Sequence, residues 1–122
     1  MILRMAGAPF KWIARICARE GLPDSYAEVV VDYLRSLADQ VLELRQKTSR
    51  PVIVGINGGQ GSGKSTLSLF LVEWLERECG LSAACLSLDD LYLSKAKRQE
   101  LSSSIHPLFA TRGVPGTLDV AL

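Results

Sequence analysis

The stretch VIVGINGGQGSGKST, residues 52–66, runs from apolar residues into glycines and then into an amphipathic segment. This order predicts a β-strand, a phosphate-binding loop and a helix. Gly58, Gly63, Lys64 and Ser65 match the pattern G-x-x-x-x-G-K-[ST] with no mismatch. We therefore expect this stretch to bind the phosphates of a nucleotide.

The residue types in the loop suit a triphosphate anion. Backbone N–H groups converge on phosphate oxygens only where side chains do not obstruct them, and glycines remove that obstruction. The Lys64 ammonium would reach the β- and γ-phosphates, and the Ser65 hydroxyl would bind Mg²⁺. ATP and Mg²⁺ are therefore the expected cofactors. The residues expected to bind the nucleotide are Gly58, Gly59, Gln60, Gly61, Ser62, Gly63, Lys64, Ser65 and Thr66.

Two other interpretations of these glycines are possible. A glycine-rich turn could match the pattern by chance, but the apolar run before it and the helical pattern after it make chance a poor explanation. A dinucleotide-binding loop is disfavoured, because Lys64 or Thr66 stands where the last glycine of G-x-G-x-x-G is needed.

Composition narrows the class of protein. The chain has 122 residues, is 48% hydrophobic and carries a formal net charge of +1. One modest core suits this length, and the charge provides no overall field for nucleic acid or an anionic membrane. The three cysteines form no C-x-x-C pair, which suits a reducing compartment. We expect a cytoplasmic protein that binds neither nucleic acid nor membrane.

An N-terminal helical segment is expected over residues 1–50, packed on the core. Residues 10–17 carry apolar side chains at helical spacing, and a targeting peptide is disfavoured because basic residues interrupt the apolar run. Ser25 and Glu28 have the spacing of a capping box, which predicts the start of a long helix. Its expected packed face consists of Tyr26, Val29, Val30, Tyr33, Leu34, Leu37, Val41 and Leu44.

Residues 51–122 are expected to form a phosphate-loop kinase core. Residues 67–75 predict a crossover helix, and residues 83–88 a second buried strand. A right-handed β-α-β connection would place the end of that strand beside the phosphate loop. The predicted fold class is α/β, a phosphate-loop NTPase fold with a parallel sheet preceded by N-terminal helices. It is expected to be incomplete, because two strands are recognised where such sheets have about five or six.

Asp89 and Asp90 follow the second predicted strand. An acid at this place can hold Mg²⁺ through water or accept the proton of an attacking hydroxyl, and the sequence does not separate these roles. The alternative is that both aspartates cap the next segment. Tyr92 would wall a substrate pocket or simply pack. Residues 95–98 are expected to be a solvated helix face, and residues 101–104 a loop or helix cap.

A loop rich in glycine and proline follows at residues 111–117. Arg112 in this loop could bind a carboxylate or phosphate through paired hydrogen bonds. His106 could orient a substrate, or it could be a structural histidine ahead of a proline turn.

The runs SLDDLYL (87–93), HPL (106–108) and ATRGVPGTLD (110–119) resemble the D-glycerate 3-kinase family. That family belongs with the phosphoribulokinase, uridine kinase and pantothenate kinase group of phosphate-loop kinases. The resemblance covers roughly residues 51–122 and implies that Asp89 is the catalytic acid. The residues expected on the acceptor side are Asp90, Tyr92, His106, Arg112 and Asp119.

The chain departs from this family in three ways. The family usually has Phe where Leu91 stands and His where Leu118 stands. Family members also continue beyond the position of Leu122, so we expect the chain to be an N-terminal portion of a kinase.

The resemblance implies an ATP-dependent kinase that transfers the γ-phosphoryl group to a hydroxyl of a small acid, D-glycerate. Lys64 and Asp89 would be the catalytic residues, and Ser65 and Asp89 the metal residues. One alternative is a nucleotide-dependent ATPase or switch, in which Asp89 serves only the metal. Another is a catalytically inactive kinase fragment that offers an interaction surface.

Overall fold

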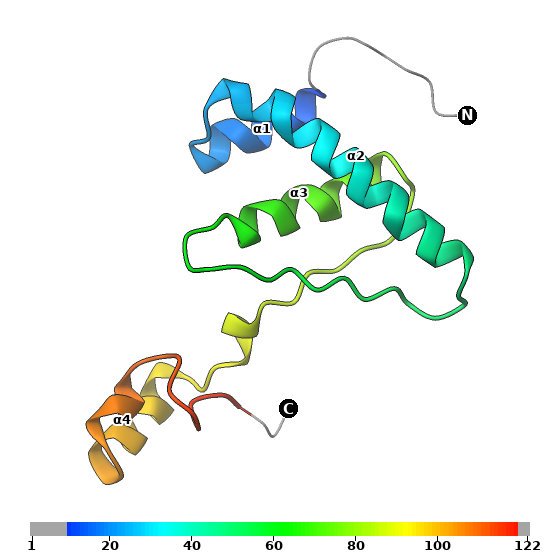
Figure 1. The fold of residues 1–122 in the computed structure, drawn as a ribbon. Coiled ribbons are helices and arrows are strands. Elements are labelled where there is room, and N and C mark those ends of the chain that lie inside the picture. Colours follow the sequence, from blue (N-terminus) through cyan, green and yellow to red (C-terminus); the bar gives the residue numbers. More distant parts are fainter. Residues whose placement is uncertain (1–9, 120–122) are drawn as a thin grey trace. The chain divides into compact units, whose positions relative to one another are not determined.

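The structure, a computed structural model, describes residues 10–119. The first nine residues of the predicted N-terminal segment and the last three of the predicted kinase core lie outside this range. The chain divides into two compact units, Met1–Cys85 and Leu86–Leu122. The helices of the described range, drawn in Figure 1, are α1 (Lys11–Glu20), α2 (Asp24–Gln46), α3 (Lys64–Arg77), η1 (Leu88–Leu91), α4 (Lys95–Ser104) and η2 (Pro107–Ala110), where η marks a 3-10 helix.

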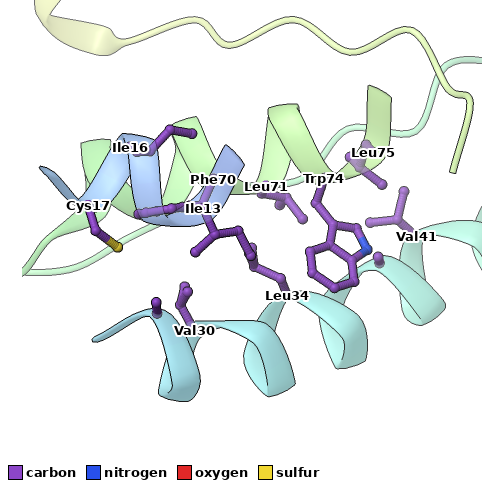
Figure 2. Close-up of a cluster of buried hydrophobic side chains, with 12 residues drawn as sticks. Ile13, Ile16, Cys17, Val30, Leu34, Val41, Phe70, Leu71, Trp74 and Leu75 are labelled. Atoms are coloured by element: carbon purple, nitrogen blue, oxygen red, sulfur yellow. The ribbon is translucent and has the colours of Figure 1, made fainter. Parts of the chain in front are cut away.

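The first unit is built on three packed helices. α1 and α3 both pack against α2 and also contact each other. Figure 2 shows their apolar side chains pointing toward a common centre. Because these side chains recur every three or four residues, each helix buries one stripe. The buried residues are Ile13, Ile16, Cys17, Ala27, Val30, Leu34, Ala38, Val41, Phe70, Leu71, Trp74 and Leu75.

Aromatic rings join α1 and α3. The indole of Trp12 donates a hydrogen bond from Nε1 to Oε1 of Glu78 at 2.9 Å. The Trp12 ring also packs against Trp74 in an edge-to-face arrangement, with 6.1 Å between centroids. These contacts orient α1 on α3, and α3 is the helix whose first residue is Lys64.

The start of α2 differs from the prediction. The helix begins at Asp24, with Pro23 in extended conformation as the N-cap, and no side chain makes a capping hydrogen bond. The predicted capping box of Ser25 and Glu28 is therefore wrong. The box does not form because Ser25 already lies in the first helical turn, whereas a capping hydroxyl must precede that turn.

The predicted α/β fold with a parallel sheet is wrong for the residues that the structure describes. Between residues 10 and 119 no β-strand occurs, and the predicted strands at 52–57 and 83–88 lack regular structure apart from the start of η1. A strand forms only where a neighbour accepts and donates its backbone hydrogen bonds. No such bonds join these two segments in the described range. Ile53 and Leu86, predicted to be buried, are 93% and 76% exposed.

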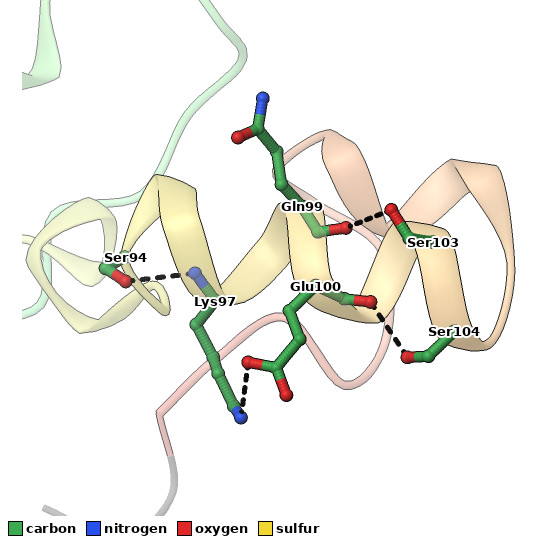
Figure 3. A network of polar contacts seen from close by, with 6 residues as sticks. All are labelled: Ser94, Lys97, Gln99, Glu100, Ser103 and Ser104. Atoms are coloured by element: carbon green, nitrogen blue, oxygen red, sulfur yellow. Dashed lines mark hydrogen bonds and ion pairs between the residues drawn. The ribbon is translucent and has the colours of Figure 1, made fainter.

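In the second unit, α4 is longer than expected. Its N-cap is Ser94, whose hydroxyl accepts a hydrogen bond from the Lys97 backbone N–H at 3.2 Å. Residues 101–104, expected to be a loop or helix cap, form its last turn. The Ser103 and Ser104 hydroxyls donate to carbonyls four residues earlier, as Figure 3 shows, so polar side chains here bond along the helix itself.

Arg98 ties α4 to the segments around it. The side chain is buried, with Nε donating to the Leu93 carbonyl at 3.2 Å and Nη1 donating to the Ala110 carbonyl at 3.3 Å. The prediction of a solvated face over residues 95–98 is thus wrong for Arg98, although Lys95 and Lys97 are exposed. A guanidinium can donate to two separate carbonyls, and these two hydrogen bonds stabilise Arg98 in its buried position.

Candidate functional site

The glycine loop, residues 58–63, has a conformation that favours glycine at Gly61 and Gly63. Gly61 and Gly63 have φ angles of 75° and 85°, in the left-handed region that other residues avoid. A Cβ at Gly58 would lie 2.8 Å from the Ser62 hydroxyl oxygen. The Ser62 N–H donates to the Gly59 carbonyl at 3.2 Å and closes a turn. The loop therefore forms a tight turn that its glycines allow.

α3 begins directly after this loop. Gly63 is its N-cap, and no side chain caps the helix. The first N–H groups of an α-helix have no partner within the helix, and this end carries a partial positive charge. The Lys64 ammonium lies at the same end, where it donates to the Gly59 carbonyl at 2.6 Å. Backbone donors and a cation are thus gathered at one place.

The structure keeps the nine predicted nucleotide-binding residues together as the glycine loop and the first turn of α3. All six loop residues and Ser65 are exposed, whereas Lys64 and Thr66 are partly buried. A hydrogen-bond acceptor from solution can therefore reach this end of α3. Such an arrangement can hold an anion with several oxygens, such as a phosphate group.

A cavity of about 300 Å³ opens beside the glycine loop. Sequence reasoning missed it, because α2 was expected to turn a single apolar face to the core. The apolar stripe of α2 is in fact wider than the surface that α1 and α3 cover. This excess width is the sequence signal that could have indicated a cavity. The cavity is lined by Tyr26, Val29, Val30, Tyr33, Leu37, Ile56, Asn57, Ser62, Gly63, Lys64 and Leu67.

In the second unit, the two neighbouring aspartates differ in what they contact. Asp90 accepts a hydrogen bond from the Ser87 backbone N–H at 3.2 Å, while the Asp89 N–H donates to the Ser87 hydroxyl at 3.2 Å. Together these bonds form a capping box on η1. The Asp89 carboxylate is exposed and accepts no hydrogen bond within the described chain. Asp90 thus has a structural partner, and Asp89 keeps its carboxylate available.

Three of the predicted acceptor residues lie close together. The Arg112 guanidinium lies over the Tyr92 ring, 5.7 Å from its centroid. Tyr92 forms an isolated antiparallel bridge with Leu118, and the Asp119 N–H donates to the Leu91 carbonyl at 2.7 Å. Backbone pairing therefore holds Tyr92 and Asp119 together in the second unit, and the contact of its guanidinium with the Tyr92 ring places Arg112 beside them.

His106 has a structural contact of its own. It is the N-cap of η2, and its Nδ1 accepts a hydrogen bond from the Leu108 backbone N–H at 3.3 Å. Of the two roles considered for this residue, the structure supplies direct evidence for the structural one.

The cysteines do not form a site. Burial, and next the negative charge of Asp24, raise the pKa of the Cys17 thiol. Burial, followed by the charges of Asp39 and Glu78, also raises the pKa of Cys79. A raised pKa lowers the fraction of thiolate, the form that acts as nucleophile and metal ligand. In residues 10–119 no three acidic, histidine or cysteine side chains gather as a metal site, and none of the helices there has the length and apolarity to cross a membrane.

Comparison with known proteins finds two kinase-type relatives. Over 93 residues the chain is 42% identical to the uncharacterized kinase mug58 of Schizosaccharomyces pombe, covering 71% of the chain and 33% of that protein. Over 53 residues it is 36% identical to the polyphosphate:AMP phosphotransferase of Pseudomonas aeruginosa, covering 43% of the chain and 11% of that protein. The chain thus spans about a third of the first relative and about a tenth of the second.

The same comparisons found no matching family model and no matching solved structure. The two names hint at a kinase-type family, and neither mentions D-glycerate. They support phosphoryl transfer in general and leave the acceptor open.

Proposed function

We propose that this chain binds ATP with Mg²⁺ at the glycine loop and the first turn of α3, and that it transfers the γ-phosphoryl group to a hydroxyl of a small acid, D-glycerate. The observation that carries the proposal is the meeting of the glycine loop, the uncapped start of α3 and the Lys64 ammonium at one exposed place. In this role the stretch acts as a Walker A phosphate loop.

The first unit would hold the donor. The loop N–H groups and Lys64 would bind the β- and γ-phosphates, with Lys64 exchanging its hydrogen bond to the Gly59 carbonyl for phosphate oxygens. The Ser65 hydroxyl would be a ligand of Mg²⁺. Mg²⁺ held there would supply positive charge that offsets the negative charge of the phosphates.

The second unit would supply the acceptor residues. Asp89 would orient or deprotonate the attacking hydroxyl, a role that needs a carboxylate with no other partner. Arg112 would bind the carboxylate of the acid through its guanidinium N–H groups. The guanidinium could do so from its present place over the Tyr92 ring or after moving away from that ring. Asp119 would lie near the same region.

The test of the acceptor is ADP formation by the purified protein at saturating Mg-ATP. We expect ADP to form when D-glycerate is present, with one phosphoglycerate for each ADP. ADP formation at the same rate without any acid would instead support the ATPase or switch. In a separate assay without ATP, formation of ADP from polyphosphate and AMP would instead support polyphosphate as the donor and AMP as the acceptor, the pair in the name of the Pseudomonas relative.

The test of the donor site is Lys64→Ala. We expect this substitution to weaken Mg-ATP binding by roughly 1.5 to 3 kcal/mol, because charge-assisted contacts to phosphate are lost. Thermal stability should change little, since the side chain makes one partly exposed hydrogen bond. Isothermal calorimetry gives both affinities, and Lys47→Ala is the matched control because Lys47 is exposed and pairs with Glu43 on α2. Equal affinities in wild type and Lys64→Ala would contradict the assignment.

A further inference from the structure

The cavity beside the glycine loop is lined by apolar and aromatic residues and by a few polar ones. Its wall on α2 is apolar and includes two tyrosines, Tyr26 and Tyr33. The polar residues of its lining are Ser62 from the loop, Lys64 from the start of α3, and Asn57. All of these residues belong to the first unit. A ligand that fits the cavity must therefore combine a flat or apolar body with an anionic group.

The α2 wall extends from the three-helix core to exposed side chains. Val30 on this helix is buried, whereas Tyr33, three residues later, is 65% exposed. Tyr26 is partly buried, and its ring lies 5.9 Å from that of Phe70, so the core holds this tyrosine in place. One fixed ring and one accessible ring thus lie two helical turns apart along the cavity wall.

We propose that this cavity takes the aromatic base of the nucleotide whose phosphates bind the glycine loop, with Tyr33 stacking on the base. The inference rests on the proposed function, because the loop must hold the phosphates for the base to be placed there. Aromatic side chains stack on any base through its π-face. The Asn57 amide has both donor and acceptor groups that suit the edge of a base.

The size and position of the cavity favour a base over other bodies. About 300 Å³ lies at the lower end of the range of roughly 300 to 1,000 Å³ for small-molecule sites, most of which combine apolar walls with a few polar groups. Because Lys64 and Ser62 line the same cavity, an occupant is continuous with the anion site. A ligand with phosphates at one end and a flat ring system at the other meets both conditions.

The experiment compares ATP with inorganic tripolyphosphate, which has the phosphates but no base. For the wild-type protein, calorimetry should show tighter binding of ATP. Tyr33→Ala should weaken ATP binding about tenfold and leave tripolyphosphate binding unchanged, because a stacked base is lost and no phosphate contact is. Tyr33→Phe retains the ring and should keep the wild-type affinity for ATP.

Leu44→Ala is the matched control, since Leu44 lies on α2, is 52% exposed and does not line the cavity. It should leave both affinities unchanged. Equal ATP affinity in Tyr33→Ala and wild type, or equal weakening of ATP and tripolyphosphate, would overturn the base assignment while the phosphate site stands. Binding of neither ligand by the wild-type protein would instead overturn the proposed function, and the base assignment with it.

Discussion

Asp89→Asn is expected to lower the rate of phosphoryl transfer from ATP to D-glycerate by about two orders of magnitude, as expected for the loss of a general base. Asn has nearly the same shape as Asp but cannot accept the proton of the attacking hydroxyl. The Asp89 side chain is exposed and accepts no hydrogen bond within the described residues, so the substitution removes no structural contact. Mg-ATP affinity should stay close to that of the wild-type protein.

Asp90→Asn separates the catalytic role from a structural one. Asp90 is the next residue, but its carboxylate accepts the Ser87 N–H in the capping box of η1. We expect this variant to keep most of the transfer rate and to lose only part of a cap, which typically contributes about 1 kcal/mol. Equal loss of transfer in both variants would assign the effect to local structure. Collapse of Mg-ATP binding in Asp89→Asn would make Asp89 a metal residue.

Phe70→Ala is expected to lower the free energy of unfolding of the first unit by about 3 to 5 kcal/mol. Phe70 is fully buried at the centre of the three-helix core, and its ring lies 5.9 Å from that of Tyr26 and 6.5 Å from that of Trp12. The substitution removes the ring and leaves a cavity that neighbouring helices fill only in part. Three helices lose contacts at once, because Tyr26 belongs to α2 and Trp12 to α1.

Chemical denaturation followed by helical circular dichroism measures this loss. Leu44→Ala serves again as the control, since an exposed position should change stability by less than about 0.5 kcal/mol. A loss below about 1 kcal/mol in Phe70→Ala would contradict the packing described for the core. If the glycine loop binds Mg-ATP, saturating nucleotide should offset part of the lost stability, because a ligand that binds only the folded state stabilises it.

Local patterns in the sequence were sufficient for most of the helices of the first unit and for the glycine loop. Apolar residues at helical spacing predicted α1, most of α2 and α3, since one buried stripe is a property of a single segment. The residues predicted to bind nucleotide are contiguous, so Gly58 through Thr66 stay together as the glycine loop and the start of α3 without distant contacts. The sequence does not show which of Asp89 and Asp90 has a structural role. The structure does, because the Ser87 N–H donates to the carboxylate of Asp90.

The sequence by itself thus predicted α1, most of α2, α3 and the stretch from Gly58 to Thr66, because helical spacing and a loop motif are properties of one continuous segment. Only the tertiary structure decided the rest. The apolar runs at 52–57 and 83–88 resemble buried strands, yet a strand exists only with a partner, and none pairs with them in the described range. Arg98 is buried because its guanidinium donates hydrogen bonds to carbonyls of two other segments. Tyr33 faces a cavity because α1 and α3 cover only part of the apolar stripe of α2.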